Sequence, residues 1–255
     1  MIELRNVSKS WDNGKTFAVN DVSFQLESGK VLALLGGSGS GKSTTIKMIN
    51  RLIEPTSGSI FIDDENITTQ DPVQLRRRIG YVFQAVGLFP HMTVRENVAQ
   101  VPKLAGVPDS EYAPKVDQLL ELVHLPSDDF GDRYPHQLSG GQRQRIGFAR
   151  ALAADAKLML LDEPFGALDP ITRDSLQAEF RSLQEQLKLT AIIVTHDMAE
   201  ALILADQIAI MSEGHVIRCG TPRELLNNPG HEYVAQLLET PRRHGQLMKQ
   251  LEATE

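Results

Sequence analysis

The chain alternates short apolar runs with longer stretches in which apolar residues recur every three or four positions. Residues 2–26 alternate apolar and polar positions on either side of the turn residues Asp12-Asn13-Gly14. This pattern predicts a pair of antiparallel strands. Compact apolar runs follow at 31–35, 79–83, 158–161 and 191–194. Runs of this length are typical of strands buried inside a parallel sheet.

Between residues 87 and 154 the periodicity becomes helical. Thr93 and Glu96 have the spacing of a capping box at the start of one helix, and Tyr112, Val116 and Leu120 mark the apolar face of another. We therefore expect an α/β fold with a parallel-sheet core, an N-terminal antiparallel β subdomain and an inserted α-helical subdomain over about 87–154. One domain over 1–240 and a polar tail over 241–255 are the expected boundaries.

The first buried run leads into a glycine-rich loop and then into a helix. The loop reads Gly36-Gly37-Ser38-Gly39-Ser40-Gly41-Lys42-Ser43-Thr44, which fits the phosphate-binding pattern G-x-x-x-x-G-K-[ST]. Its backbone N–H groups and the helix N-terminus attract a polyphosphate, Lys42 reaches the β- and γ-phosphates, and the Ser43 hydroxyl holds Mg²⁺. The alternative is a glycine-rich turn that only closes a connection. The strand, spacing, Lys and Ser together favour a nucleoside triphosphate site.

Polar residues follow the other predicted core strands where those strands end. Gln84 follows 79–83, Asp162-Glu163 follow 158–161, and His196 comes after 191–194. Open α/β sheets present ligand-binding groups at the carboxyl ends of their strands. Of the two adjacent carboxylates, one is a candidate to orient Mg²⁺ and the other to polarise the attacking water. Gln84 is a candidate for either role, and His196 for the γ-phosphate. The alternatives are acids that open a polar loop, a solvated amide and a structural histidine.

A second candidate anion site lies at Leu138-Ser139-Gly140-Gly141-Gln142. Ser139 and Gln142 have capping-box spacing, two glycines bare the backbone, and the helix that follows carries Arg143, Arg145 and Arg150. The alternative is an ordinary capped surface helix. Because a triphosphate has one γ-phosphoryl group, two such sites imply either two ligands or one ligand held between two copies of the chain.

Trp11, the only tryptophan, falls in the loop between the first two strands. Its ring is a candidate to stack on a flat ligand such as adenine, or else to fold back over the core. Asp169-Pro170 is a helix N-cap followed by proline at the first helical position.

The bulk properties narrow the class of protein. The chain has 255 residues, 41% of them hydrophobic and 23% charged, with a net charge of −7, which is ordinary globular composition and argues against a general nucleic-acid surface. No apolar run approaches the roughly 18 residues of a membrane span, the N-terminus lacks the pattern of a signal peptide, and a single Cys219 fits a reducing compartment. We expect a cytoplasmic protein whose membrane role comes through a partner.

Taken together, these motifs resemble the ATP-binding subunits of ABC transporters over roughly residues 1–240. The motifs that carry the resemblance are the Gly36–Thr44 loop, Gln84, Leu138–Gln142, Leu158–Glu163, Ala167-Leu168-Asp169 and His196. The resemblance implies that Trp11 stacks on adenine, that Lys42, Ser43 and Thr44 bind phosphate and Mg²⁺, and that Gln84 senses the nucleotide and couples to the membrane partner.

The same resemblance implies that Asp162 supports Mg²⁺, Glu163 is the general base and His196 contacts the γ-phosphate. Ser139, Gly140, Gly141 and Gln142 would complete the site of the opposite subunit in a head-to-tail homodimer, with Asp169 at the seam. The implied partners are transmembrane permease subunits and, through them, a substrate-binding protein. The chain would lie on the inner face of the cell membrane.

A finer resemblance links the chain to the ATPases of osmoprotectant importers, which carry glycine betaine, choline and related quaternary amines. It rests on Lys47–Leu52, Gly87–Thr93 and Tyr134–Gln137. Gly37 departs from the proline that many relatives have. The stretch after Leu238 is shorter than the paired regulatory domains of some betaine-importer ATPases, which argues against ionic-strength sensing through such domains.

Other functions compete with this interpretation. One is an ABC importer ATPase for another solute, such as an amino acid or a sugar. A soluble ABC ATPase of translation or DNA repair is a second, disfavoured by a single cassette without heptads. A third, a module that holds ATP without hydrolysing it, is disfavoured by Glu163.

Overall fold

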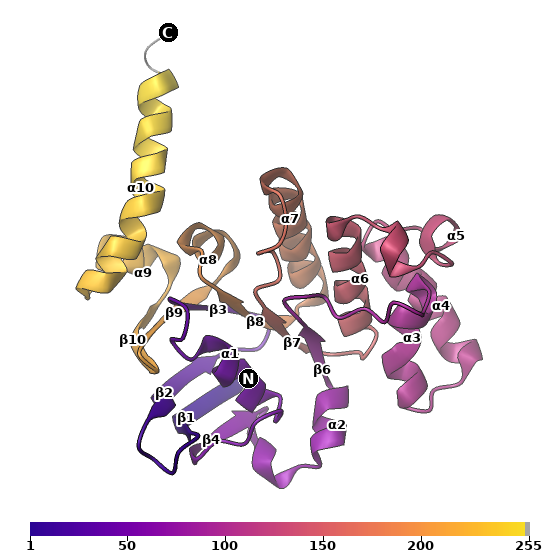
Figure 1. Cartoon of the computed structure of the whole chain (residues 1–255), viewed down its shortest axis with the longest axis horizontal. Coiled ribbons are helices and arrows are strands. Elements are labelled where there is room, and N and C mark those ends of the chain that lie inside the picture. The colour runs from indigo at the N-terminus through magenta and orange to yellow at the C-terminus, as the bar shows by residue number, and fades with distance from the viewer. Residues whose placement is uncertain (253–255) are drawn as a thin grey trace.

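A six-stranded mixed sheet forms the centre of the protein (Figure 1). The computed structural model describes the backbone of residues 1–252 and the side chains of residues 1–243. The sheet has the strand order β10-β9-β3-β8-β7-β6, with every neighbouring pair parallel except β9 and β10. Its strands are β3 (Val31–Leu35), β6 (Ile79–Val82), β7 (Leu158–Asp162), β8 (Thr190–Thr195), β9 (Gln207–Ser212) and β10 (His215–Gly220).

Strand β3 is buried along its whole length and divides the core in two. Val31, Ala33 and Leu35 belong to a cluster formed with the helical side of the molecule. Leu32 and Leu34 belong to a second cluster on the opposite face. Because successive side chains in a strand point to opposite faces, an unbroken apolar run is required here. The predicted parallel core is confirmed.

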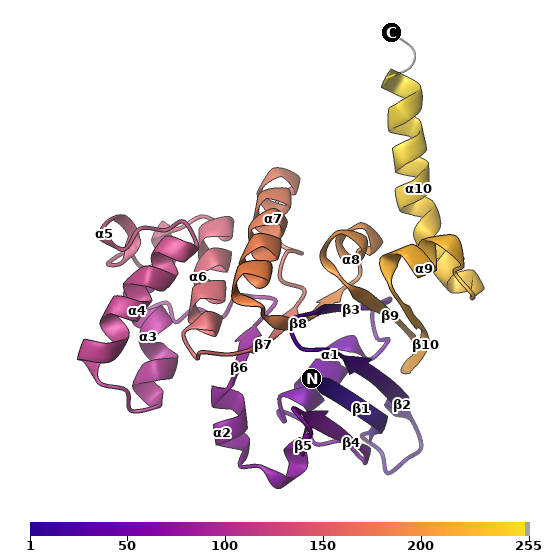
Figure 2. The ribbon, with the colours of Figure 1, turned by 180° about the vertical axis from the view of Figure 1, so that it is seen from behind.

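A four-stranded antiparallel sheet and helix α1 (Lys42–Ile49) cover one face of the central sheet (Figures 1 and 2). The strand order is β2-β1-β4-β5, and the predicted pairing of residues 2–26 is confirmed, with Ile2 opposite Leu26. The elements of this region are β1 (Ile2–Ser10), β2 (Phe17–Leu26), β4 (Ser57–Ile62), β5 (Glu65–Asn66), η1 (Ile67–Thr69) and α2 (Pro72–Arg77).

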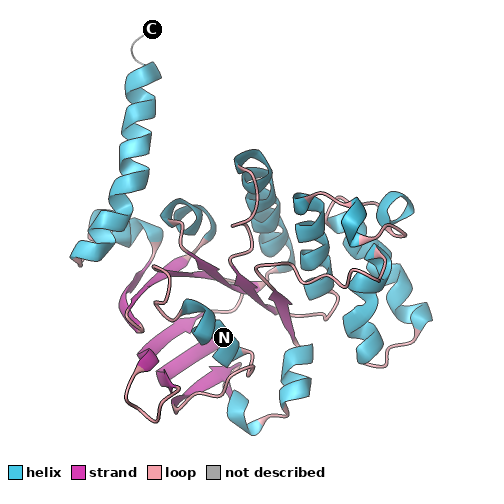
Figure 3. Cartoon of the chain, viewed as in Figure 1, coloured by secondary structure: helices cyan, strands magenta, loops and turns pink. Residues whose placement is uncertain are grey.

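The helical subdomain predicted over about 87–154 is present as a group of helices beside β6 (Figure 3). It comprises α3 (Val94–Leu104), α4 (Asp109–Leu122), α5 (Ser127–Phe130), η2 (Pro135–Gln137) and α6 (Gly140–Leu152). The Thr93–Glu96 capping box is formed in both directions. This subdomain therefore begins at a side-chain cap, as the sequence predicts.

The remaining helices are α7 (Pro170–Leu187), α8 (Met198–Leu204), α9 (Pro222–Asn227) and α10 (Glu232–Glu252). Val234 and Leu238 anchor α10 in the core, and the helix then runs away from the body of the protein (Figure 1). It passes the boundary predicted at residue 240, so the expected tail is helical as far as Glu252; residues 253–255 of that tail lie outside the described residues. Among residues 1–252, no helix combines the length and apolarity that a membrane span requires.

Candidate nucleotide site

The glycine loop joins the end of β3 to the start of α1, and two of its glycines have no room for a side chain. A Cβ on Gly36 would lie 2.2 Å from the carbonyl oxygen of Met211. Gly41 has a φ of +100° and a Cβ there would lie 2.5 Å from the carbonyl oxygen of Ala18. Gly41 is also the N-cap of α1 and offers no side-chain hydrogen bond. The first N–H groups of α1 are therefore not used by a side-chain cap.

Lys42 turns back into this loop. Its Nζ donates to the carbonyl oxygens of Gly36 and Gly37, both at 2.7 Å, and to the Ser40 hydroxyl at 3.3 Å. Burial lowers the pKa of Lys42, while the negative charges of Glu163 and Asp162 act in the opposite direction. The ammonium is thus placed inside the ring of loop atoms and beside two carboxylates.

Asp162, the last residue of β7, is tied to the loop by Ser43. The Ser43 hydroxyl donates to Asp162 Oδ1 at 2.9 Å. Mg²⁺ prefers oxygen ligands and is usually held by one or two protein groups together with phosphate oxygens and water. No cluster of three or more His, Cys, Asp or Glu side chains with metal-ligand geometry occurs within the described part of the chain. The oxygens of Ser43 and Asp162 therefore fit a nucleotide-bound Mg²⁺ better than a metal caged by protein alone. Gln84, the third residue expected to hold Mg²⁺, bonds to Glu163.

Two other strand-end residues, Gln84 and His196, lie next to Glu163. Gln84 donates from Nε2 to Glu163 Oε2 at 3.1 Å, and His196 Nδ1 lies 3.4 Å from the same oxygen. The register explains this meeting, since Asp162 pairs with Val194 and Val82 pairs with Leu161. Glu163 itself has a φ of +47°, a conformation uncommon for a residue other than glycine. The backbone is strained at the residue proposed for catalysis.

At the second candidate anion site, the predicted capping box is formed. Ser139 accepts from the Gln142 N–H at 3.2 Å, and Gln142 Oε1 accepts from the Ser139 N–H at 2.9 Å. Ser139 and Gly140 are exposed, whereas Gly141 is buried. A Cβ on Gly141 would lie 2.6 Å from Thr172 Cγ2. This glycine therefore lets α6 approach α7.

The three arginines of α6 bond to other parts of the same chain. Arg143 donates to the carbonyl oxygen of Leu138 at 2.9 Å, and Arg145 pairs with Glu179 at 2.6 Å. Arg150 is buried and donates to the carbonyl oxygens of Gly87 and Val86 at 2.7 and 2.6 Å. These bonds tie α6 to the neighbouring segments of the chain.

Asp169 and Trp11 lie outside the Glu163 network. Asp169 caps α7 by accepting the Thr172 N–H at 3.1 Å, and hydrogen bonds from Thr172 lower the pKa of Asp169. Trp11 is 65% exposed, with the Lys9 ammonium 4.4 Å from its ring centroid. The alternative in which Trp11 covers the core is therefore wrong. Its stacking on adenine stays a prediction.

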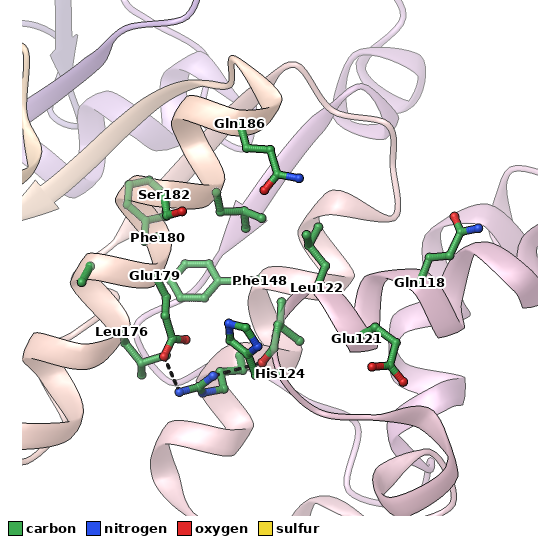
Figure 4. Close-up of a pocket in the computed structure, with 14 residues that line it drawn as sticks. Gln118, Glu121, Leu122, His124, Phe148, Leu176, Glu179, Phe180, Ser182 and Gln186 are labelled. Atoms are coloured by element: carbon green, nitrogen blue, oxygen red, sulfur yellow. Dashed lines mark hydrogen bonds and ion pairs between the residues drawn. The ribbon is translucent and has the colours of Figure 1, made fainter.

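A large cavity of about 730 Å³ lies elsewhere, between α4, α6 and α7 (Figure 4). Phe148, Phe180 and Leu183 line it, together with Arg145 and Glu179, which form an ion pair. None of the residues expected at the nucleotide site lines this cavity. The candidate nucleotide site therefore does not lie in this cavity.

Two residues near the site, Arg150 and Glu200, make contacts that the sequence did not predict. Arg150 fixes Val86, whose φ of +56° is a strained conformation for a β-branched residue. Glu200 is a carboxyl group with 6% exposure next to the strand end that carries His196. A charged residue on the buried face of each helix was the available signal, since such residues are seldom buried without a specific partner.

Comparison with known proteins establishes the class. The sequence profile of the family described as ABC transporter matches residues 19–166. This match covers more than half of the chain and includes the glycine loop, the Leu138–Gln142 segment and Glu163. The chain belongs to the ABC transporter family of ATP-binding domains.

Individual relatives agree with this assignment. The choline transport ATP-binding protein OpuBA of Bacillus subtilis is 55% identical over 93% of this chain, and the chain covers 62% of OpuBA. The glycine betaine uptake system ATP-binding protein YehX of Escherichia coli is 48% identical over 92% of this chain and 76% of its own length.

Solved structures show the same fold. The ATP-binding cassette MJ0796, in a dimeric post-hydrolysis state bound to ADP and phosphate, is 33% identical, with a TM-score of 0.76 over 88% of this chain and 99% of that one. The predicted α/β fold with a parallel core is confirmed by this similarity.

Proposed function

We propose that the chain is the ATP-binding and ATP-hydrolysing subunit of an importer for osmoprotectants such as glycine betaine, choline or other quaternary amines. The observation that carries the hydrolytic part is the placement of Glu163, which receives Gln84 and adjoins His196. It also directly follows Asp162, the partner of the loop residue Ser43. The glycine loop and the hydrogen-bonded carboxylate of Glu163 thus lie at the same edge of the central sheet.

Phosphate binding falls to the loop and α1. The uncapped N-terminus of α1 contributes N–H donors and partial positive charge. Lys42 exchanges its bonds to the carbonyl oxygens of Gly36 and Gly37 for the stronger charge-assisted bonds to the β- and γ-phosphates. Asp162, Ser43 and Gln84 would hold Mg²⁺, which when bound neutralises phosphate charge.

Hydrolysis is assigned to the strand-end residues. A water held against Glu163 Oε2 transfers its proton to that carboxylate as its oxygen attacks the γ-phosphorus, and the bond to ADP breaks. Gln84 fixes the same carboxylate oxygen, and His196, which is exposed, donates to the γ-phosphate. Glu163, Gln84 and His196 all stand at strand ends on the same edge of the central sheet.

The active form in this proposal is a head-to-tail homodimer. Ser139, Gly140, Gly141 and Gln142 of one subunit would complete the site of the other. Ser139 and Gly140 are exposed, and Ile171, close to Asp169, is 84% exposed. An exposed helix N-terminus and an exposed apolar residue both suit a seam between subunits. The dimeric state of the MJ0796 cassette supports a dimer.

The partner in the membrane is proposed to dock beside Gln84. A groove of about 280 Å³ lies between β6, α3 and the loop after Gln84. Phe83, Phe89 and Leu104 line it, with 46, 42 and 68% exposure. Exposed apolar side chains gathered in a groove mark an interaction site, here one adjacent to the nucleotide-sensing amide. The chain would thus reside on the inner face of the membrane, held by permease subunits.

The cargo is inferred from the choline and glycine betaine named in the relatives. A permease and an external binding protein would select it, the latter holding a quaternary ammonium by cation–π contacts. The test is to purify the complex and measure ATPase stimulation by glycine betaine, choline, a sugar, an amino acid and a metal chelate. Stimulation by betaine-like compounds alone is expected. Stimulation by another solute but no quaternary amine would replace the cargo and leave the ATPase proposal standing.

A further inference from the structure

The loop that carries Gln84 leaves strand β6 through a tight turn. Phe83 is the first residue after β6, and the Val86 N–H donates to the Phe83 carbonyl oxygen at 2.9 Å. Gln84 and Ala85 are therefore the two central residues of this turn, and both are exposed. Because burial does not hold an exposed turn in place, the position of the Gln84 side chain depends on the bonds that anchor the turn.

Arg150 of α6, the helix that packs against β6 (Figure 1), anchors this turn at its last residue. Its Nη2 donates to the Val86 carbonyl oxygen at 2.6 Å, and its Nη1 donates to the Gly87 carbonyl oxygen at 2.7 Å. The next side-chain anchor along the described loop is Asn97, whose amide bonds to the backbone of Phe89 at 2.8 and 3.1 Å. Arg150 is therefore the anchor nearest to the turn.

The backbone that Arg150 holds is strained. Val86 has a φ of +56° and Gly87 a φ of +60°. A positive φ is an outlier for a β-branched residue, and such a conformation persists only where the surrounding structure enforces it. Helix α6 comes close enough to do so because position 147 is a glycine, where a Cβ would lie 2.9 Å from Val86 Cγ1. The close contact and the two hydrogen bonds act on the same residue of the turn.

Arg150 is a costly residue at this buried position. Both of its acceptors are neutral carbonyl oxygens, and burial lowers the pKa of Arg150 with no neighbouring carboxylate of the described chain acting against it. A buried charge without a counter-charge costs free energy that an apolar side chain would not. The planar guanidinium, however, presents several donors in a fixed fork, which neither an apolar side chain nor the single ammonium nitrogen of lysine can reproduce. Arginine therefore fits a role in orienting two carbonyl groups at once.

We propose that Arg150 is a positioning residue for Gln84. By holding the Val86 and Gly87 carbonyl oxygens, it keeps the turn in the arrangement in which Gln84 Nε2 donates to Glu163 Oε2 at 3.1 Å. Among the described residues its own hydrogen bonds go to these two oxygens and not to Glu163, so it acts on hydrolysis through the turn. The inference rests on the proposed ATPase activity and adds to it a residue of the helical subdomain.

The first experiment measures kcat and KM for ATP of the chain without a membrane partner, so that weakened docking cannot lower kcat. Arg150→Met removes both bonds and should lower kcat about 10- to 100-fold, the effect of a small displacement near the reacting atoms, with an unchanged KM. Arg150→Lys retains a cationic donor and should recover part of kcat. Arg145→Lys, on the same helix but paired with Glu179, is the matched control and should keep the wild-type kcat.

A second measurement separates positioning from a general loss of structure. In the Gln84→Ala background no amide is left to position, so Arg150→Met should cause no further loss of kcat. A merely structural role would lower kcat by the same factor in both backgrounds. If Arg150→Met does not give folded protein, the same comparison is made with Arg150→Lys.

Hydrogen exchange provides a readout that does not depend on activity. Arg150→Met should speed the exchange of the Val86 N–H, which closes the turn, while exchange in β3 stays at the wild-type rate. Because β3 is buried along its whole length, its exchange reports unfolding of the core rather than of the turn.

The outcomes are distinguishable. A lower kcat in Arg150→Met, partial recovery in Arg150→Lys and no further loss in the Gln84→Ala background support the inference. It is overturned, with the ATPase proposal left standing, by an unchanged kcat in Arg150→Met, by an equal loss in both backgrounds, or by exchange that rises as much in β3 as at Val86. Absence of ATP hydrolysis by the wild type overturns both proposals.

Discussion

The N-termini of α1 and α6 are both suited to an anion, but they are built in opposite ways. Helix α1 begins after Gly41 without a side-chain cap, and its first residue, Lys42, is buried. Helix α6 begins after Ser139 with a complete capping box, and Ser139 and Gly140 are exposed. An uncapped N-terminus has donors ready for phosphate, whereas a capped one must give up a side-chain bond or share it.

This difference indicates that the N-termini of α1 and α6 have different roles. Around helix α1 the same chain supplies several bonded groups, with Asp162 tied to Ser43 and Glu163 receiving Gln84. The bonds of Ser139 and Gln142, within the described residues, stay inside their own cap. The α6 terminus is therefore capped without a ligand, and in the proposed dimer it would cover the nucleotide of the other subunit.

The largest expected effect comes from Glu163→Gln. The amide keeps the size of the side chain but cannot accept a proton, so turnover should fall about 10²–10⁴-fold with nucleotide binding retained. Steady-state phosphate release and a nucleotide titration measure the two quantities. Asp174→Asn, an exposed change on α7, is the control. Hydrolysis by Glu163→Gln at the parent rate would remove the role given to this carboxylate.

Lys42→Ala should weaken triphosphate binding itself. It removes the buried ammonium from the loop, and a hydrogen bond to a charged group contributes about 1.5–3 kcal/mol, or roughly 10- to 100-fold in affinity. Calorimetric titration with a non-hydrolysable ATP analogue provides the measurement. Lys47→Ala on the same helix is the matched control, since Lys47 stands in the last turn of α1. Equal affinities for the two variants would contradict the loop assignment.

Ser139→Arg tests the other helix end. A bulky side chain at the first turn of α6 should cost about 1–3 kcal/mol of ATP-dependent dimer stability, while the monomer still binds nucleotide at α1. Sedimentation of this change in the Glu163→Gln background, with ATP, gives the dimer fraction. Ser110→Arg, in the first turn of α4, is the control. An ATP-dependent dimer unaffected by Ser139→Arg would show that the two ends do not meet across subunits.

Trp11→Ala should have the smallest effect. Loss of an aromatic stacking contact costs about 0.5–1.5 kcal/mol, or a few-fold in ATP affinity, with hydrolysis at saturating ATP unchanged. Trp11→Phe should restore part of the loss because it retains a ring. Inorganic triphosphate, which has no adenine, is the control ligand. If Trp11→Ala lowers the affinity for triphosphate and for ATP by the same factor, the Trp11 ring does not contact adenine.

The features that could be predicted from the sequence are those that depend on neighbouring residues. The Gly36–Thr44 spacing, the buried runs and the caps at Thr93, Ser139 and Asp169 each depend on residues within one turn or one strand. Such features are specified by short-range sterics and hydrogen bonding. They placed the strands and helix starts within a few residues of the observed bounds.

The sequence by itself determined which residues stand at strand ends, because an apolar run followed by a polar residue reports both burial and its limit. Only the tertiary structure decided which of these residues meet. The order β3-β8-β7-β6 puts Glu163 between Gln84 and His196, and no local pattern encodes strand order. Packing likewise decided that Arg150 bonds to Val86 and that Glu200 is buried behind His196, since desolvation depends on what other elements bring against a side chain.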